Sequence, residues 1–327
     1  MGIPVMRGFA QAGASGVTKK HYMRSKHHTG TNMPQTTLAS VTEVQGIGVH
    51  TGAEVILRLK PAEVNTGIVF VRTDVLGPDN HVPVKPTAVT SATLSTIISN
   101  AAGVSVATIE HVMAALSALG VDNAILELDG PEVPIMDGSA RDFVAIIDKA
   151  GVQRQQATRH VLRILHPIEV DEGDKWARLE PAQTFTVDCA IDFDTPLISR
   201  QRIVLAMSDR AFRQELAVAR TFGFAKDVEA LRAQGLARGG SLDNCIVIEN
   251  DQVKNPGGLR YADEFVRHKA LDAIGDLYVL GMPVLGRFEA YKPGHALNNS
   301  LVRAVLQQPQ CWDVVSEHEL AAARTQA

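Results

Sequence analysis

The sequence predicts an α+β protein built from two similar domains, each with a β-sheet packed on helices. Strand-like segments precede helix-like segments in residues 33–155, and the same order returns in residues 156–305. Runs of strands followed by helices are typical of α+β domains rather than of βαβ units. A polar, weakly patterned stretch at 151–160 lies between the two halves and suits a linker. The length of 327 residues is sufficient for two ordinary domains.

In the first half, alternating apolar and polar residues at 55–59 indicate a half-buried strand. The glycines of Gly46–Gly52 resemble a dinucleotide-binding pattern, but a strand follows them instead of a helix, which excludes that interpretation and favours a turn. We expect Thr108 to cap a helix that has a single apolar stripe. A buried strand at Ala124–Leu128 and a helix at about Ala140–Ala150 complete this half.

In the second half, an insertion at about 223–250 interrupts the strand-then-helix order. It contains a short helix at Ala225–Gln234 and a strand-like segment at Cys245–Ile248. Its apolar residues could line a groove, or they could form a small core of a surface excursion. The other expected elements are strands at Val161–Ile164, Ile168–Asp171, Ala177–Pro181 and Thr184–Ile191, and helices at Ser208–Ala219 and Tyr261–Leu280.

The composition excludes several classes of function. The net charge of -4 gives no sign of a nucleic-acid-binding surface, and the aromatic content of 5% argues against a base-stacking platform. The sequence has no run of 18 apolar residues, so no stable insertion in a membrane is expected. The three cysteines (Cys189, Cys245 and Cys311) lack CxxC spacing, which favours reduced, structural thiols in a cytoplasmic protein.

Residues 1–32 differ from the rest of the chain, since they hold five Lys or Arg residues and no Asp or Glu. They have no continuous apolar segment, so a secretory signal is not expected. A disordered extension, or translation that begins at Met33, is the preferred interpretation. The basic, acid-poor composition leaves a transit peptide as an alternative.

Two short motifs carry the candidate chemistry. Glu110 and His111 stand together at the start of the first-half helix, and His268 and Asp272 stand four residues apart in the last expected helix. His111, His268 and Asp272 would supply three protein ligands and leave one position of a tetrahedral Zn²⁺ site open for water. The remaining carboxylate, Glu110, could take a proton from that water. These are the groups of a metal-dependent hydrolase.

Each of these residues also has a simpler explanation. A single pair such as His268 and Asp272 is often a local hydrogen bond, and Glu110 could only stabilise a helix start through the helix dipole. Asp276 continues the i, i+4 spacing, however, so three polar groups share one helix face, which indicates a site. His295 lies in a segment with Gly and Pro after a strand, where either a catalytic or a mobile loop histidine is expected.

Five motifs occur in a fixed order between about Gln35 and Val305. They are Thr-Ile-Glu-His-Val, Pro-Ile-Met-Asp-Gly-Ser, Arg-Thr-Phe-Gly, His-Lys-Ala-Leu-Asp-Ala-Ile-Gly-Asp-Leu and Gly-His-Ala-Leu-Asn-Asn. In this order they closely resemble the UDP-3-O-acyl-N-acetylglucosamine deacetylases, zinc enzymes of bacterial lipid A synthesis. The resemblance implies that the helices of both domains face each other around an active site between the domains. Residues 306–327 are expected to be a tail outside the resemblance.

The resemblance also implies a role for each residue at a matching position. It implies that Zn²⁺ is bound by His111, His268 and Asp272, and that Glu110 is the general base for the attacking water. His295 would be the general acid that protonates the leaving amine.

Further roles are implied around this centre. Asp276 would orient the general acid, and Thr221 would donate a hydrogen bond to the oxyanion. Lys269 would contact the nucleotide phosphates. Phe222, Leu94 and the insertion at about 223–250 would form the passage for the acyl chain.

The expected partner is therefore a small molecule, UDP-3-O-acyl-N-acetylglucosamine, in the bacterial cytoplasm, and no protein partner is implied. One alternative is a different zinc amidase or peptidase, although the sequence contains no His-Glu-x-x-His motif. A second alternative is a non-catalytic relative that binds nucleotide-sugar or acyl ligands. The presence of every implied catalytic residue argues against it.

Overall fold

The structure, a computed structural model, describes residues 33–316 and 319–320. The described residues belong to one compact unit. The expectations for residues 1–32 lie outside the described residues. The α+β class is confirmed, since six helices and 21 strands are assigned in the described ranges. No helix in these ranges is long and apolar enough to cross a membrane.

One five-stranded sheet comes entirely from the first half of the chain. Its order is β2 (Thr42–Ile47), β3 (Glu54–Pro61), β9 (Ala124–Leu128), β4 (Ile68–Arg72) and β5 (His81–Pro83). Only the β9–β4 pair is parallel, and the other pairs are antiparallel. The predicted turn around the glycines is confirmed as the β2–β3 connection.

A second five-stranded sheet comes from the second half and repeats this pattern. Its order is β12 (Ile168–Asp171), β13 (Trp176–Glu180), β20 (Arg287–Tyr291), β14 (Thr186–Ile191) and β15 (Gln201–Ala206). Again only the third pair in this order, β20–β14, is parallel, and the other pairs are antiparallel. The two halves therefore share one strand topology, as the repeated order of strands and helices predicted.

Four smaller sheets surround these two. Their members are β1 (Pro34–Leu38) with β10 (Val152–Thr158); β11 (His160–Ile164) with β19 (Val284–Leu285) and β21 (Trp312–Ser316); β6 (Val89–Ser91) with β7 (Ile97–Ser99) and β8 (Ser105–Val106); and β16 (Phe222–Phe224) with β17 (Ile246–Glu249) and β18 (Gln252–Val253). Most of the stretch predicted as a linker at 151–160 is therefore strand, because its polar residues pair with β1. The predicted tail likewise contributes β21.

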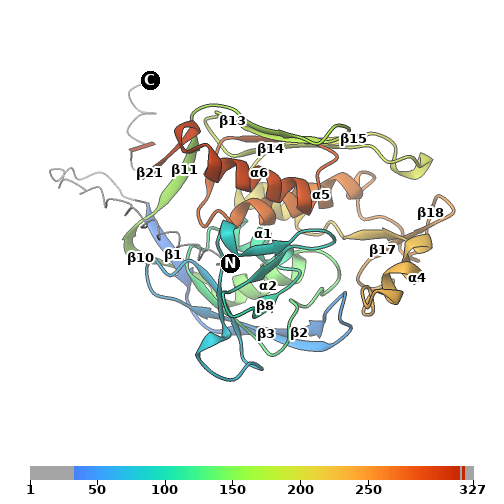
Figure 1. Ribbon diagram of the computed structural model, residues 1–327, viewed down its shortest axis with the longest axis horizontal. Helices are drawn as coiled ribbons and strands as arrows, with labels where there is room; N and C mark the ends of the chain where they lie inside the picture. Colours follow the sequence, from blue (N-terminus) through green and yellow to red (C-terminus); the bar gives the residue numbers. More distant parts are fainter. Residues whose placement is uncertain (1–32, 317–318, 321–327) are drawn as a thin grey trace, which may run out of the picture. The chain divides into compact units, whose positions relative to one another are not determined.

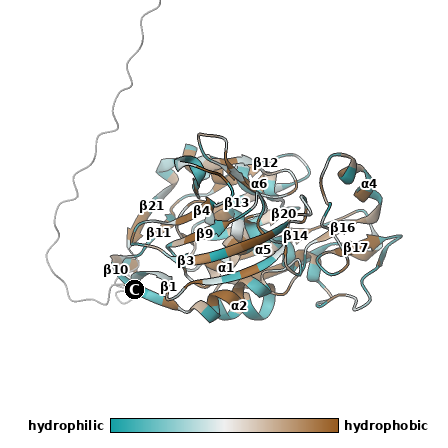
Figure 2. Cartoon of the chain, turned by 90° about the horizontal axis from the view of Figure 1, so that it is seen from below, coloured by the Kyte–Doolittle hydropathy of each residue, from teal (hydrophilic) through white to brown (hydrophobic). Residues whose placement is uncertain are grey.

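The helices lie mainly between the two five-stranded sheets, with α1 and α5 side by side at the centre (Figure 1). Figure 2 shows hydrophobic and hydrophilic turns alternating on α2, which buries Phe143 and Ile147. The bounds are α1 Glu110–Ala118, α2 Arg141–Ala150, α3 Asp209–Ala211, α4 Ala225–Ala233, α5 Glu264–Tyr278 and α6 His295–Gln307. Short helical turns occur at Pro78–Asn80, Pro86–Ala88, Pro196–Ile198, Phe212–Leu216 and Pro309–Cys311.

The close crossing of α1 and α5 depends on one glycine. A Cβ atom added to Gly275 would lie 1.9 Å from the carbonyl oxygen of Glu110 and 3.1 Å from the backbone nitrogen of Ala114. Real Cβ atoms essentially never come within 3.0 Å of another heavy atom in this way. The absence of a side chain at position 275 therefore allows the two backbones to touch where the candidate site begins.

Two local predictions are wrong. Thr108 does not cap α1: the N-cap is Ile109, and Thr108 has a φ of 59°, which is strained for a β-branched residue. Its hydroxyl instead donates to Glu132 at 3.0 Å. His295 is not in a loop but is the first residue of α6, because the Gly/Pro segment ends at the N-cap, Gly294.

Candidate metal centre

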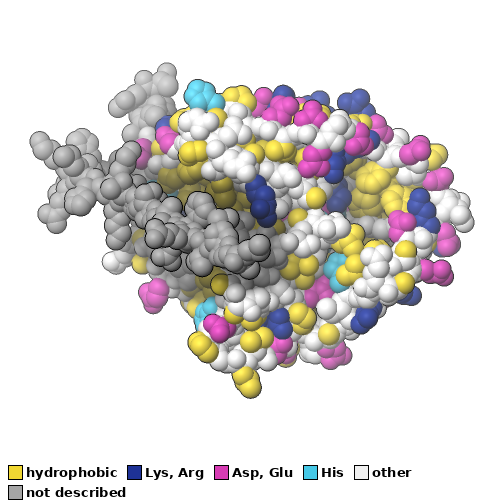
Figure 3. All heavy atoms as spheres, viewed as in Figure 1, with side chains coloured by type: hydrophobic (Ala, Val, Ile, Leu, Met, Phe, Trp, Pro, Cys, Tyr) yellow, Lys and Arg dark blue, Asp and Glu magenta, His cyan; other side chains and the backbone are white. Residues whose placement is uncertain are grey.

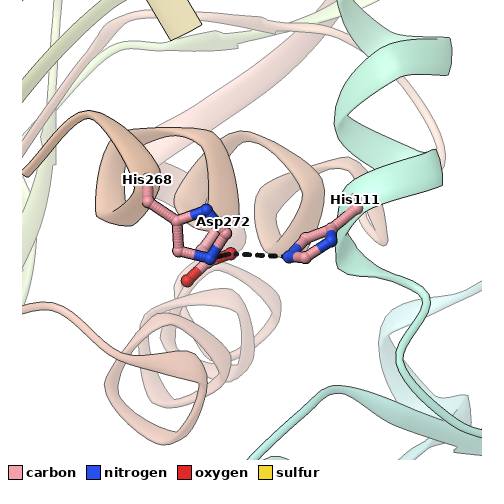
Figure 4. A group of neighbouring side chains, drawn as sticks. All are labelled: His111, His268 and Asp272. Carbon is pink, nitrogen blue, oxygen red and sulfur yellow. Dashed lines mark ion pairs between the residues drawn. The ribbon is translucent and has the colours of Figure 1, made fainter. Parts of the chain in front are cut away.

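Three side chains from α1 and α5 converge at the helix crossing. His111 lies in the first turn of α1, while His268 and Asp272 share one face of α5 (Figure 4). One nitrogen or oxygen from each of the three lies within 4.8 Å of the others. The Asp272 Oδ1 atom is 3.2 Å from His268 Nε2 and 3.5 Å from His111 Nε2. The sequence-predicted ligands are therefore brought together, and all three are buried.

The protonation pattern of this cluster suits a cation. The Nδ1 atom of His268 lies 3.1 Å from the carbonyl oxygen of Ala219, so it must carry the proton and donate it. Burial lowers the pKa of His268 to about 3, although Asp272 acts to raise it, and the ring is therefore neutral. Its Nε2 then directs a lone pair at the Asp272 Oδ1 atom, which is buried and has no hydrogen-bond partner.

Two lone pairs that face each other in a buried site repel unless a positive group lies between them. A metal ion bound by these atoms removes the repulsion and satisfies the orphaned Oδ1 atom. The ligand type is also suitable, because two imidazoles and one carboxylate form a common catalytic zinc set with an open fourth position. The residues present therefore fit a metal ion. The backbone carbonyl of Ala219 accepts the Nδ1 proton of His268 and so fixes its tautomer, as hydrogen-bond partners of metal-bound histidines generally do.

Lys269 occupies the other side of the Asp272 carboxylate. Its Nζ lies 3.0 Å from Asp272 Oδ2 and 5.6 Å from the centre of the Phe222 ring. Burial acts to raise the pKa of Asp272, but its charged and hydrogen-bonding neighbours, the Lys269 ammonium among them, outweigh this effect and hold it well below its usual range. Asp272 is therefore a carboxylate, with one oxygen neutralised by an ammonium group and the other directed at the two imidazoles.

A second pair of groups lies beside this cluster. The Nε2 atom of His295 is 3.6 Å from Glu110 Oε1 and 3.9 Å from Asp272 Oδ2. On the other side of the ring, His295 Nδ1 is 2.9 Å from Asp276 Oδ2 and donates to it. The three side chains are almost fully buried. Glu110 and His295 therefore face each other, and Asp276 lies on the opposite side of the imidazole ring.

The electrostatic environment separates the two groups chemically. Burial raises the pKa of Glu110, and this effect outweighs the opposing influence of His295 and His111. Burial acts to lower the pKa of His295, but the carboxylates of Asp276 and Glu110 outweigh it and raise that pKa to about 10. A carboxylate of increased basicity therefore faces an imidazolium that carries a proton on Nε2. A pair whose environments differ in this way suits general base and general acid roles.

Sequence reasoning missed two residues that support this pair and a third that supports the start of α1. Thr96 donates to both carboxylates, through its backbone N–H to Glu110 Oε2 at 3.0 Å and through its hydroxyl to Asp276 Oδ1 at 2.6 Å. The side-chain amide of Asn298 donates to Asp276 Oδ2 at 2.8 Å. The motif Gly-His-Ala-Leu-Asn-Asn contains Asn298 one helical turn after His295, so its spacing could have indicated it. Nothing in the local sequence marks Thr96.

The third residue is Glu132, which is also buried. Its carboxylate accepts hydrogen bonds from the backbone N–H groups of His50 and Thr51 and from the hydroxyls of Thr51 and Thr108. It thus joins the β2–β3 turn to the strained residue that precedes α1. No spacing in the local sequence marks this carboxylate, so its function was not predicted.

A cavity of about 620 Å³ opens onto these groups. Every sequence-predicted site residue except Asp276 lines it, including Thr221, Phe222 and Leu94. The Phe222 ring packs 5.0 Å from that of Phe265 and 6.5 Å from that of His268, measured between ring centres. Leu94 lines the cavity and is 43% exposed.

The insertion forms the apolar side of this cavity. β16, α4 and β17 make a parallel strand–helix–strand unit, which confirms the short helix and the strand-like segment that the sequence predicted. Figure 3 shows hydrophobic side chains gathered toward the side of the molecule that carries this unit, with charged groups around them. The groove interpretation is supported over the isolated mini-core by its lining residues, which include Phe224, Val228, Leu231, Ala237, Leu242 and Val247.

A His₂Asp set that could hold a metal ion, an adjacent carboxylate–imidazolium pair and an apolar cavity define the class of hydrolases. Comparison with known proteins gives the family. Residues 35–307 match the model of the LpxC family, described as UDP-3-O-acyl N-acetylglycosamine deacetylase. The chain belongs to this family.

Similar curated proteins extend over most of the chain. The chain is 57% identical over 282 residues to the UDP-3-O-acyl-N-acetylglucosamine deacetylase of Phenylobacterium zucineum (strain HLK1). The aligned residues cover 86% of this chain and 96% of that protein. It is 51% identical over 284 residues to the protein of the same name from Shewanella frigidimarina, covering 86% and 92%. The corresponding protein of Shewanella pealeana is 50% identical over 291 residues, covering 88% and 95%.

Proposed function

We propose that this protein is a zinc-dependent deacetylase that hydrolyses the N-acetyl group of UDP-3-O-acyl-N-acetylglucosamine in lipid A biosynthesis. The products are acetate and UDP-3-O-acyl-glucosamine. The observation that carries the proposal is the convergence of His111, His268 and Asp272 beside the Glu110–His295 pair. Family membership and the names of the relatives support the substrate.

The metal would be held by His111, His268 and Asp272, and when bound it would polarise the acetyl carbonyl and acidify water. Glu110 takes a proton from the attacking water, whose oxygen forms the new bond to the acetyl carbon. The hydroxyl of Thr221 stabilises the oxyanion by a hydrogen bond. His295 then donates its Nε2 proton to the nitrogen as the C–N bond breaks, so that a neutral amine leaves.

Asp276 keeps His295 oriented throughout, because it accepts the Nδ1 proton and leaves Nε2 directed at the substrate. The apolar wall formed by Leu94, Phe222 and the insertion receives the acyl chain. Lys269, beside the ligand cluster, contributes positive charge for the nucleotide phosphates. A cytoplasmic location accords with a nucleotide-sugar substrate.

The decisive experiment measures acetate release from UDP-3-O-acyl-N-acetylglucosamine by purified protein, with and without a metal chelator. We expect release that the chelator abolishes and added Zn²⁺ restores. An acetylated peptide serves as the comparison substrate. Preferred turnover of the peptide would indicate a different amidase, and substrate binding without acetate release would indicate a non-catalytic protein.

A further inference from the structure

Thr96 connects the two carboxylates on which the proposed acid and base depend. It lies between β6 and β7, just before β7 begins, and it is only 3% exposed. All three of its polar groups are engaged: the N–H with Glu110, the hydroxyl with Asp276, and the carbonyl oxygen with the N–H of Ile109 at 3.4 Å. One residue of the first half thus contacts both a first-half and a second-half carboxylate.

These contacts close a ring. Thr96 donates to Glu110 Oε2, the other oxygen of Glu110 faces His295 Nε2, His295 Nδ1 donates to Asp276 Oδ2, and the other oxygen of Asp276 accepts the Thr96 hydroxyl. Each carboxylate uses one oxygen for Thr96 and the other for His295. Rotation of either carboxylate would therefore break a contact with Thr96.

We propose that Thr96 is a positioning residue whose hydroxyl holds Asp276, and through it the His295 imidazole, in the orientation required for proton donation to the leaving amine. This inference rests on the proposed function. Asp276 has two partners on Oδ2, His295 and Asn298, but the Thr96 hydroxyl is the donor that the structure gives to Oδ1.

The hydroxyl is important because both partners are buried. Without it, the buried Oδ1 atom loses a charge-assisted hydrogen bond, and the carboxylate turns toward its remaining donors. The His295 ring, which is held through Nδ1, turns with it. A displacement of about 1 Å at a reacting group can lower the rate by about 100-fold. The effect is expected in kcat, because the contact orients a proton donor and does not bind substrate.

The test compares two substitutions at the same position. Thr96→Val keeps the shape and the backbone N–H to Glu110 but removes the hydroxyl, and we expect kcat to fall roughly 10–100-fold with KM unchanged. Thr96→Ser keeps the hydroxyl and should retain kcat within about threefold. Thr90→Val is the matched control, since Thr90 is exposed in β6 and its hydroxyl lies 2.9 Å from that of Ser99. It should leave kcat unchanged.

A double-mutant cycle with His295→Ala separates positioning from general destabilisation. If the hydroxyl acts through His295, Thr96→Val should lower kcat by less than about threefold in the His295→Ala background. Loss of the same factor in both backgrounds, wild-type kcat in Thr96→Val, or equal loss in Thr96→Ser would each overturn the proposal.

A second readout does not depend on activity. In proton NMR of ¹⁵N-histidine-labelled protein, the Nδ1–H resonance of His295 reports its hydrogen bond to Asp276. It should shift in Thr96→Val and stay in place in Thr96→Ser, and an unchanged resonance in Thr96→Val would overturn the proposal. Absence of acetate release from the wild-type protein would overturn the proposed function, while the NMR contrast would still decide the contact.

Discussion

Substitution of Gly275 by Ala should weaken metal binding without removing a ligand. The added Cβ would lie 1.9 Å from the carbonyl oxygen of Glu110. Carbon–oxygen contacts between packed backbones lie at about 3.3–3.6 Å, so α1 and α5 must separate by roughly 1.5 Å at this point. His111 belongs to α1, whereas His268 and Asp272 belong to α5, and the separation therefore acts directly on the ligand set.

The size of this displacement determines the expected result. Metal–ligand distances tolerate changes of about 0.2 Å, so a shift several times larger must be absorbed by strained side chains or by a lost ligand. We expect metal affinity to fall roughly 10–100-fold, as for other changes that displace ligands from outside the coordination sphere. Overpacking costs about 1–3 kcal/mol, but replacing a helical Gly by Ala returns about 1 kcal/mol. Metal affinity is therefore a clearer measure than stability.

The assay is a competition titration of the metal against a chromophoric chelator, with thermal unfolding of the metal-free protein measured in parallel. Gly257→Ala is the matched control, because no atom lies within 4 Å of a Cβ at Gly257 and its φ is compatible with alanine. Wild-type metal affinity in Gly275→Ala would refute the reasoning, since the helices would then have accommodated the methyl group without moving the ligands.

Three further predictions concern the ligands, the proton-transfer pair and the chain start. His268→Ala should reduce bound metal well below the expected value of about one ion per chain, and undiminished metal in that variant would exclude His268 as a ligand. Activity should be lost as pH falls through the pKa of Glu110, which is raised, and as pH rises through that of His295, about 10. Glu110→Gln should flatten the acidic limb, His295→Ala should flatten the basic limb, and each should lower kcat roughly 10²–10⁴-fold while bound metal is retained. An unchanged basic limb in His295→Ala would assign the acid role elsewhere. A chain that starts at Met33 should keep its fold and activity, because the family match begins at residue 35, and loss of folded protein would contradict this.

The ligand set could be predicted from the sequence because helical spacing is local information. His268 and Asp272 must share a face if their segment is helical, and Glu110 and His111 must occupy a first turn if a helix begins there. That the two helices meet is not local information, and only the resemblance to a known family implied it. The structure explains the meeting through Gly275, where a side chain would separate the helices.

Contacts that depend on tertiary structure were not predictable from the chain. The polar strand β10 was interpreted as a linker because apolar and polar residues do not alternate clearly along it, yet its backbone pairs with that of β1. Thr96 lies 180 residues from its partner Asp276 and has no motif around it. Thr108 has the residue type of a helix cap, but its hydroxyl is engaged by Glu132. In each case a distant partner outweighed the local preference.

The division of the site between helices has an energetic consequence. The proposed ligands come from α1 and α5, and the proposed base and acid come from α1 and α6, so neither set exists unless the helices are packed together. A metal that binds only this packed arrangement stabilises it, by about 2.7 kcal/mol when its free concentration is 100 times its Kd. That is comparable to the cost of a methyl group at Gly275, about 1–3 kcal/mol. Metal binding and the packing of α1 on α5 are therefore expected to be coupled, because a bound metal would oppose the separation of the helices that a methyl group at Gly275 causes.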